Sequence, residues 1–352
     1  MTRILISAYT GLGNFILKTP IIKEIKELYP DVKIDLIAGN GFGTEFILRN
    51  SDLVNKTFIL KENDSIWKKM KLFINMKENN YDLILLAFDS NRKFLFFGSY
   101  LAKIKTRIIH INLKSKVKML FFSFMPSTTL VPLLPSRHEI DLNFDLLEAY
   151  INKPVQRNYN TFISNTKNKD ILVKFTLEEN RYIVLQVGAA NGIKSAKKWS
   201  IDNFEKLIKV LNKKYPKYNI VTVGDQGDYE NDIRGLENKN LDFINTAGLT
   251  SIDEVANLLY FSKIVVANDS GIMHMANALN CYLIALYGPT DYTRTRPLGK
   301  KSRILYSKTD CFCKMYNFSG NEIKLLDEYP TCMDGITVEH LYLEIYKILG
   351  EH

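Results

Sequence analysis

Short apolar runs alternate with amphipathic stretches along most of the chain. Runs rich in Val, Ile and Leu predict buried parallel strands, and apolar positions three and four residues apart predict helices that pack against them. Strands that alternate with helices favour doubly wound α/β domains. The predicted strands cover residues 2–9, 34–38, 54–60 and 81–88 in the first half, and 182–187, 219–223, 264–267 and 282–287 in the second.

A polar stretch separates the two halves. Residues 152–168 are rich in Asn and contain Pro154, which is typical of a linker. We therefore predict an N-terminal domain over residues 1–160, a C-terminal domain over 161–335 and a final helical segment over 336–352. Two open α/β domains of similar size are expected to hold a ligand in the cleft between them.

One predicted strand of the second half leads into a turn of small polar residues. The apolar run 264–267 is followed by Asn268-Asp269-Ser270-Gly271 and then by a helical pattern. A strand, a small polar turn and a helix together aim unpaired backbone N–H groups at an anion, and the helix dipole adds positive potential there. The competing interpretation is that Asp269 or Ser270 serves only as an N-cap.

Other loops of the same kind follow other predicted strands. Gly188, Gly224 and Gly288-Pro-Thr-Asp291 come directly after apolar runs. Because the carboxyl ends of parallel strands share one rim of a sheet, these loops are expected to line one ligand site. In the first half, the loop ending at Gly13 has the corresponding place, but Ile16 replaces the third glycine of the dinucleotide fingerprint. A nicotinamide cofactor is therefore not favoured.

Charge is distributed unevenly along the 352 residues. The net charge is +9, and residues 1–160 carry 23 basic against 15 acidic side chains. No acidic residue lies between Asp89 and Glu139, where basic and aromatic residues alternate. Such a surface suits anionic lipid or an anionic substrate. An ordinary basic surface over an apolar core is the alternative, and nucleic acid is less favoured because no recognition motif accompanies the charge.

The chain shows no sign of secretion, membrane insertion or a metal site. It lacks a run of eighteen apolar residues, and its N-terminus begins a strand instead of a signal peptide. We therefore expect a cytoplasmic protein. Four cysteines, Cys281, Cys311, Cys313 and Cys332, invite comparison with zinc sites, but their spacing is not the paired one of a zinc ribbon. Free thiols, or a small local cluster in the loop before the last helix, are favoured over zinc, and we expect no metal.

Several motifs of the two halves recur together in one enzyme family. Those of the second half are Gln186-Val-Gly, Lys197-Lys-Trp-Ser, Val223-Gly-Asp, Asn245-Thr-Ala-Gly-Leu-Thr250, Asn268-Asp-Ser-Gly-Ile-Met-His274 and Tyr287-Gly-Pro-Thr-Asp291. Those of the first half are Gly13-Asn14 with Thr19-Pro20, Tyr81-Asp82 and Arg137-His138-Glu139. In this combination, the chain resembles glycosyltransferase family 9, the heptosyltransferase family of lipopolysaccharide synthesis, over essentially its whole length.

The resemblance implies a GT-B fold with two Rossmann-like domains facing a central cleft. The acceptor would bind the N-terminal domain and the nucleotide-sugar donor the C-terminal one, and the last helix would pack back on the first domain. The implied reaction is an inverting, metal-independent transfer of a sugar from ADP-heptose or a related donor to a lipopolysaccharide-core or other surface-glycan acceptor. An anionic glycolipid or phosphorylated saccharide would be the acceptor, and the enzyme would work peripherally at the inner face of the cytoplasmic membrane.

The resemblance also assigns roles to residues. A metal-free enzyme must stabilise the departing diphosphate with cations and helix N-termini, for which Lys197 and the turn at Ser270 are candidates. Asp269 would contact a sugar hydroxyl, and His274 either contacts phosphate or is an ordinary buried histidine. The expected donor-binding residues are Gly188, Lys197, Gly224, Asp228, Glu230, Asp269, Ser270, Gly271, His274 and Asp291. The expected acceptor-binding residues are Gly13, Arg92, Lys93, Arg137 and His138.

The catalytic base departs from the family pattern. An inverting transfer needs a group that takes the proton of the acceptor hydroxyl. The family has an aspartate directly after the glycine of the first loop, whereas this chain has Asn14, and an amide cannot act as a base. Asp89 and Asp291 are substitute candidates, while Asn14 would orient the acceptor. Alternatives are a non-catalytic nucleotide-sugar-binding relative and a nucleotide-sugar epimerase of the same fold.

Overall fold

The computed structural model forms two compact α/β units. Unit 1 runs from Met1 to Ser164 and unit 2 from Asn165 to His352. The structure describes all residues except 1, 40–41, 50, 90–91, 113–119, 121, 123, 135–136, 165, 190–196, 308–332 and 351–352. The division between the units lies inside the predicted linker.

Unit 1 is built on a six-stranded parallel sheet with the order β3-β2-β1-β4-β5-β6. Its strands are buried on both faces near the centre, as continuous apolar runs predict. The strands are β1 (Arg3–Ser7), β2 (Lys33–Ala38), β3 (Lys56–Ile59), β4 (Leu83–Leu86), β5 (Thr106–Ile111) and β6 (Thr128–Pro132).

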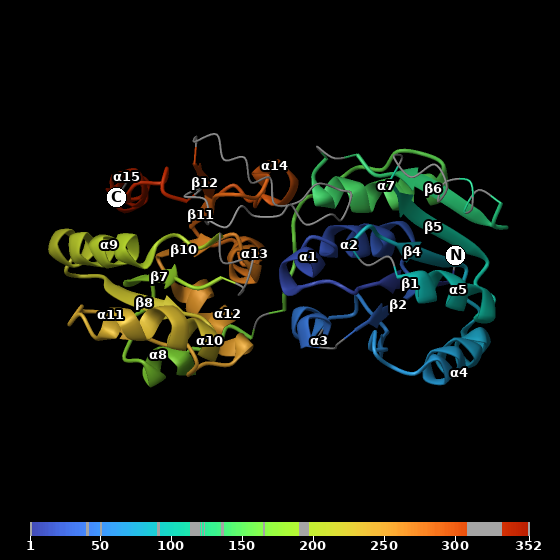
Figure 1. Ribbon diagram of the computed structural model, residues 1–352, viewed down its shortest axis with the longest axis horizontal. Coiled ribbons are helices and arrows are strands. Elements are labelled where there is room, and N and C mark those ends of the chain that lie inside the picture. The colour runs from blue at the N-terminus through green and yellow to red at the C-terminus, as the bar shows by residue number, and fades with distance from the viewer. Residues whose placement is uncertain are drawn as a thin grey trace, which may run out of the picture. The chain divides into compact units, whose positions relative to one another are not determined.

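Helices cover both faces of this sheet (Figure 1). Phe73 and Met76 of α4 and Leu95 and Phe96 of α5 pack on the face that carries Leu5, while α2 and α7 pack against each other on the opposite side. The helices are α1 (Leu12–Ile16), α2 (Thr19–Leu28), α3 (Phe42–Leu48), α4 (Ile66–Met76), α5 (Lys93–Leu101) and α7 (Glu139–Ile151).

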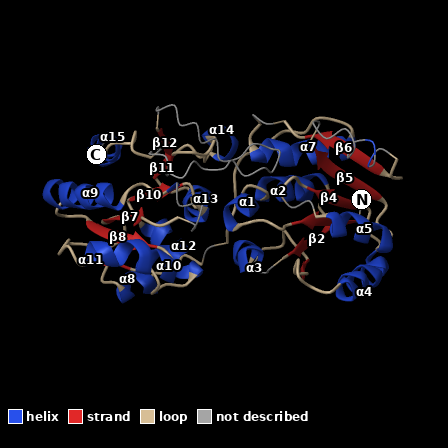
Figure 2. Ribbon diagram, in the orientation of Figure 1, coloured by secondary structure: helices blue, strands red, loops and turns tan. Residues whose placement is uncertain are grey.

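Unit 2 repeats the same topology, with the strand order β12-β11-β10-β7-β8-β9 and every pair parallel. Helices again flank the strands (Figure 2). The strands are β7 (Tyr182–Gln186), β8 (Asn219–Val223), β9 (Ile244–Asn245), β10 (Ile264–Asn268), β11 (Leu283–Tyr287) and β12 (Ser302–Tyr306). The helices are α8 (Asp170–Lys174), α9 (Ile201–Lys214), α10 (Gln226–Asp228), α11 (Arg234–Glu237), α12 (Ile252–Phe261), α13 (Gly271–Ala278), α14 (Tyr292–Thr295) and α15 (Val338–Gly350).

The sequence pattern predicts four strands for each half, whereas each sheet has six. The four additional strands have weak signals. In β5 the polar residues Arg107 and His110 interrupt the apolar run, β9 has two residues, and β6 and β12 are only partly buried. Hydrogen bonds to the neighbouring strands, which a local pattern does not reveal, define these segments.

The last helix belongs to unit 2. Leu341 and Ile345 of α15 are buried in one core with Phe204 and Leu207 of α9. Ile336, just before α15, accepts a hydrogen bond of 2.7 Å from the indole Nε1 of Trp199. The apolar face of α15 therefore completes the core of unit 2, whereas the family resemblance implies packing on the first domain.

Candidate active site

Each sheet has a point at which the strand order reverses, and ligands of open α/β folds bind there, outside the carboxyl ends of the strands. In unit 2 this switch point lies between β7 and β10, which pair directly. Gly188 follows β7, and the turn Asn268–Gly271 follows β10. The sequence motif with the clearest anion-binding pattern therefore lies where the topology favours a ligand.

Asn268 fixes the backbone around this switch point. Its buried side chain donates from Nδ2 to the carbonyl oxygens of Val187 (3.0 Å) and Gly188 (3.2 Å). Its Oδ1 accepts a hydrogen bond of 3.0 Å from the backbone N–H of Trp199. One amide thus holds together the end of β7, the turn after β10 and the segment before α9, because a buried amide is stable only when its donors and acceptors are satisfied.

In the turn after β10, the side chain of the N-cap residue does not cap the helix. Ser270 is the N-cap residue of α13, but its side chain makes no capping bond. Its Oγ instead donates to Oε1 of Gln186 at 3.2 Å. The N-cap interpretation is therefore wrong for the side chain of Ser270, which leaves the first N–H groups of α13 without that internal acceptor.

Asp269 is buried and paired with the predicted lysine. Its Oδ2 accepts a bond of 2.6 Å from Nζ of Lys197, and the two side chains are 7% and 15% exposed. The next lysine, Lys198, pairs instead with Asp232 at 2.6 Å. Of these two adjacent lysines, Lys197 is the one beside the start of α13. A carboxylate and an ammonium are thus held together at the helix N-terminus, where an anionic ligand is favoured.

Gly188 and Gly224, which follow neighbouring strands, make room for Asp228. A Cβ at either position would overlap the Asp228 side chain. Asp228 and Asp225 form a capping box at the start of α10. Burial raises the pKa of Asp228 to about 6. A partly protonated carboxyl at the rim can donate as well as accept hydrogen bonds near neutral pH.

The remaining predicted donor residues differ in their burial and in their hydrogen-bond partners. Gly271 begins α13, and His274 is buried one turn further along this helix. The carboxylate of Glu230 accepts 2.9 Å from Nε2 of Gln226. Asp291 caps α14, where its Oδ1 accepts from the backbone N–H and hydroxyl of Thr293. The Asp291 carboxylate is therefore used structurally, which weakens its candidacy as the base.

The switch point of unit 1 lies between β1 and β4. Asn14 sits on α1, just after β1, with buried Gly13 beside it. Nδ2 of Asn14 donates to Oε2 of Glu139, the first residue of α7, at 2.8 Å. Glu139 is buried, so Asn14 and a carboxylate 125 positions away share one site.

Asp89, after β4, is held by a buried lysine. Nζ of Lys18 is 2.6 Å from Oδ1 and 2.7 Å from Oδ2 of Asp89, and the Lys18 side chain is only 1% exposed. Nearby His110 of β5 accepts from the backbone N–H of Phe88 through Nδ1. Burial lowers the pKa of His110 to about 4, so the imidazole is neutral at physiological pH. Lys18 thus supplies the positive charge that compensates Asp89.

Two of the predicted acceptor-binding residues, Arg92 and Arg137, pair with acidic side chains. Arg92 pairs with Glu62, and Arg137 pairs with Asp145 at 2.9 Å. His138 is the N-cap of α7 and accepts from Ile140 through Nδ1. Lys93 is exposed at the start of α5.

Local sequence patterns missed Lys18 and the role of Glu139. Lys18 interrupts the apolar segment Phe15–Ile22, and a charged residue within such a segment is a usable signal of a buried pair. Glu139 belongs to a quoted motif, but only the fold reveals its contact with Asn14. The motif residues Cys311, Cys313 and Cys332 lie outside the described residues.

Within the described part of the chain, no three His, Cys, Asp or Glu side chains are grouped so as to hold a metal ion. The described cysteine, Cys281, is buried, and burial raises the pKa of its thiol to about 12. This thiol is therefore not poised as a nucleophile.

A comparison with protein families matches residues 69–319 to the model for glycosyltransferase family 9 (heptosyltransferase). Among curated relatives, lipooligosaccharide heptosyltransferase 2 of Haemophilus ducreyi is 27% identical over 322 residues, which cover 86% of this chain and 88% of the relative. Lipopolysaccharide heptosyltransferase 3 of Escherichia coli is 26% identical, with 81% and 82% covered.

Solved structures share the fold. The ADP-heptose lipopolysaccharide heptosyltransferase II of E. coli aligns with a TM-score of 0.71 at 22% identity, covering 100% of this chain and 99% of that one. A family 9 glycosyltransferase from Veillonella parvula aligns with a TM-score of 0.79 at 16% identity, covering 100% and 98%. Both alignments span two Rossmann-like units, as in the GT-B fold that the motifs imply.

Proposed function

From the premise that the chain belongs to glycosyltransferase family 9, the heptosyltransferase family, we propose that it transfers a heptose from a nucleotide-linked donor to an anionic saccharide of the lipopolysaccharide core or another surface glycan. The observation that carries this proposal is the pair of partly buried Lys197 and buried Asp269 beside the first turn of α13. We take ADP-heptose as the donor because relatives of the same fold are named for it.

The donor would be held by unit 2 through three kinds of group. The first N–H groups of α13 and the ammonium of Lys197 would stabilise the diphosphate as its negative charge grows during bond cleavage. Asp269, which Lys197 orients, would accept hydrogen bonds from sugar hydroxyls. Asp228 and Glu230 would contact the ribose. The protein itself provides these cationic and dipolar groups, so we propose a metal-independent transfer.

The acceptor would be activated in unit 1. We propose Glu139 as the group that takes the hydroxyl proton, with Asn14 orienting it through their 2.8 Å hydrogen bond. Asp89 is less suited than the sequence suggests, because both of its carboxylate oxygens already accept hydrogen bonds from the buried ammonium of Lys18. The carboxylate that the family supplies at the position of Asn14 would thus be replaced by one from α7. Attack from the opposite face of the sugar would invert the anomeric carbon.

A transfer assay tests the proposed reaction. The purified protein would be incubated with ADP-heptose, with other ADP- and GDP-sugars, and with delipidated lipopolysaccharide-core fragments as acceptors. We expect a mass increase of one heptose on the acceptor, inversion at the anomeric carbon by NMR, and unchanged turnover in EDTA. Transfer of another sugar, retention, or loss of turnover in EDTA would each contradict the corresponding part of the proposal.

Substitutions of Glu139 and Asp89 show which of the two carboxylates is the catalytic base. We expect Glu139→Gln to lower kcat about 100-fold or more with little change in KM, because general base catalysis contributes roughly that much. Asn14→Asp should partly restore turnover to Glu139→Gln, since it returns a carboxylate to the same site. If Asp89→Asn abolishes turnover without loss of thermal stability while Glu139→Gln remains active, Asp89 is the base instead.

Asn14 also favours a second candidate function, a nucleotide-sugar-binding protein without transferase activity. A relative that has lost catalytic activity would lack the family carboxylate, as this chain does at Asn14. Donor binding detected by thermal shift, with no turnover on any acceptor and none gained by Asn14→Asp, would favour this candidate. Conversion of free donor without acceptor would indicate an epimerase instead.

A further inference from the structure

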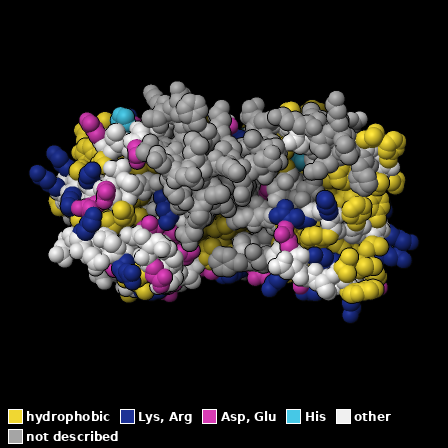
Figure 3. All heavy atoms as spheres, in the orientation of Figure 1, with side chains coloured by type: hydrophobic (Ala, Val, Ile, Leu, Met, Phe, Trp, Pro, Cys, Tyr) yellow, Lys and Arg dark blue, Asp and Glu magenta, His cyan; other side chains and the backbone are white. Residues whose placement is uncertain are grey.

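The outer side of α4 and α5 is unusually apolar for a water-facing surface. A groove of about 370 Å³ runs between the two helices. Its apolar lining consists of Ile66, Met70, Phe73, Phe94, Phe97 and Leu101. Figure 3 shows hydrophobic side chains gathered over this part of unit 1.

The fold requires only some of the side chains on this side of α4 and α5 to be apolar. Phe73 and Met76 are the buried residues of α4, and they anchor the helix to the sheet. Gly98 of α5 lets the two helices approach, because a Cβ there would overlap the ring of Phe73. By contrast, Trp67 is 76% exposed and Ile66 70% exposed. Leaving large apolar groups in water carries a free-energy cost, and a patch of this kind marks an interaction surface.

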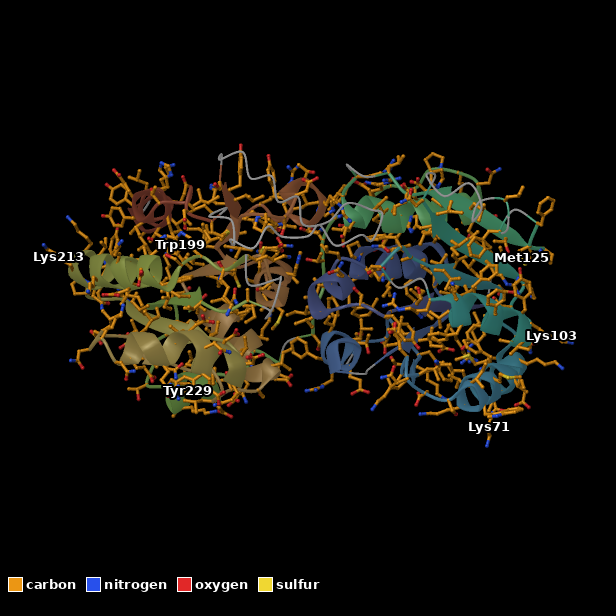
Figure 4. The ribbon with its side chains drawn as sticks, viewed as in Figure 1. Lys71, Lys103, Met125, Trp199, Lys213 and Tyr229 are labelled. Atoms are coloured by element: carbon orange, nitrogen blue, oxygen red, sulfur yellow. The ribbon has the colours of Figure 1, made fainter. Side chains whose placement is uncertain are left out.

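Lysines surround this apolar face. Lys68 and Lys71 are exposed on α4, Lys93 at the start of α5 and Lys103 just after its end. Lys71 and Lys103 project outward from the periphery of unit 1 (Figure 4). Long lysine stems can lie along an apolar surface while the ammonium groups reach a charged layer above it. We call Ile66, Trp67, Ile74, Phe97 and Leu101, with Lys71 and Lys103, the α4–α5 face.

We propose that the α4–α5 face docks unit 1 onto a bilayer that contains anionic phospholipid. Exposed Trp, Phe and Ile side chains would enter the boundary between head groups and acyl chains, and the lysines would contact the anionic head groups. A second copy of the chain fits less well, because it would bring two rings of lysines together. No helix within the described ranges is long and apolar enough to cross a membrane.

The docking proposal rests on the proposed function, because a lipid-linked acceptor lies in a membrane. Vesicle binding is nevertheless measured separately from heptose transfer. A protein that binds anionic vesicles and transfers nothing would remove the proposed function alone. A protein that transfers heptose to delipidated acceptor and ignores vesicles would remove the docking proposal alone.

Vesicle sedimentation tests the apolar part. We expect the protein to sediment with vesicles of phosphatidylethanolamine and phosphatidylglycerol and not with phosphatidylcholine alone. The triple variant Ile66→Ser, Trp67→Ser, Phe97→Ser should bind at least about tenfold more weakly, because each removed side chain loses apolar burial. The control variant Val173→Ser, Leu343→Ser, Tyr346→Ser, which changes three exposed apolar residues of unit 2, should bind as the wild type does.

Charge reversal tests the electrostatic part. One lysine near an anionic surface changes binding about fivefold. The pair Lys71→Glu, Lys103→Glu should therefore weaken vesicle binding about 25-fold or more. The pair Lys213→Glu, Lys214→Glu on α9 changes net charge equally and should have a much smaller effect. Equal losses for both pairs would mean that net charge alone attracts the protein, and the proposed face would be wrong.

Tryptophan fluorescence locates the contact. The chain has two tryptophans, and Trp199 is buried while Trp67 is exposed. Anionic vesicles should shift the emission to shorter wavelength, and Trp67→Phe should abolish the shift while vesicle binding persists. A shift that survives Trp67→Phe would overturn the proposal. So would a concentration-dependent dimer in sedimentation velocity that the triple serine variant abolishes, because a second copy would then occupy the face.

Discussion

Lys197 and Lys198 are adjacent in sequence but have different partners. Lys197 reaches Asp269 at the start of α13, whereas Lys198 reaches Asp232 in the segment that follows α10. The two side chains are almost equally exposed, so neither composition nor burial separates them. The position of the Lys197 ammonium beside the α13 N-terminus supports the proposal that Lys197, and not Lys198, contacts the donor diphosphate.

This difference predicts unequal effects of two alanine substitutions. Lys197→Ala should lower kcat about 100- to 1,000-fold, as expected when a group that stabilises developing charge is lost. Lys198→Ala should change kcat by less than about tenfold and serves as the matched control. Steady-state transfer kinetics, with thermal unfolding to verify folding, provide the measurement. Equal losses in the two variants would contradict the assignment.

The raised pKa of Asp228 predicts a pH dependence of stability. Burial favours its neutral form in the folded protein, so the folded state binds the proton more tightly than the unfolded state does. The free energy of unfolding therefore falls as pH rises through the window from about 4 to about 6.

Asp228→Asn removes this penalty and can keep the capping bond through its carbonyl oxygen. Above pH 7, the variant should be more stable than the wild type by about 1 kcal/mol, a value reduced for solvent screening. Below pH 4, the difference should disappear. Urea unfolding across this pH range measures it, with exposed Asp242→Asn as the control. A variant that is less stable at every pH would show that ionised Asp228 stabilises the fold.

Among the secondary-structure elements, the proposed donor site depends on two glycines that follow neighbouring strands. Gly188 after β7 and Gly224 after β8 allow the Asp228 carboxyl to lie against both strand ends. The two glycines therefore allow a side chain to lie close to the backbone. Neither has a positive φ, unlike Gly248. The sequence marks these glycines as loop residues, but their shared neighbour becomes visible only when β7 and β8 pair.

Gly188→Ala should consequently displace Asp228 and weaken nucleotide binding. A Cβ at position 188 overlaps the carboxyl, so we expect the Kd for ADP to rise about tenfold or more. Isothermal titration calorimetry measures this. Gly235→Ala on α11 is the matched control, because a Cβ there meets open space. Unchanged ADP affinity in Gly188→Ala would show that Asp228 does not contact the nucleotide.

At the scale of the whole molecule, the two units repeat one strand order, and each places its candidate residues at the reversal of that order. Unit 1 brings Asn14 to Glu139, and unit 2 brings Lys197 to Asp269. The helix α15 packs into the core of unit 2. Its apolar side chains therefore contribute to the stability of that unit.

Ile345→Ala should therefore destabilise unit 2. Removing a fully buried Ile side chain costs about 3 kcal/mol through lost burial and the cavity left behind. Leu343→Ala, at an exposed position of the same helix, should cost much less. Hydrogen exchange of β7 and β10 amides would report the loss in unit 2. Protection lost in β1 and β4 instead would show that α15 supports unit 1.

Local periodicity and contiguous motifs are enough to predict the two-unit α/β architecture, eight of the strands, the turn after β10 and the family. Four strands, the placement of α15 and the partners of Asn14, Lys18 and Lys197 follow only from the folded structure. Hydrogen bonds between strands and side-chain pairs such as Asn14–Glu139 join residues far apart in sequence. These contacts depend on which residues lie close together in space, and the order of residues along the chain does not show this.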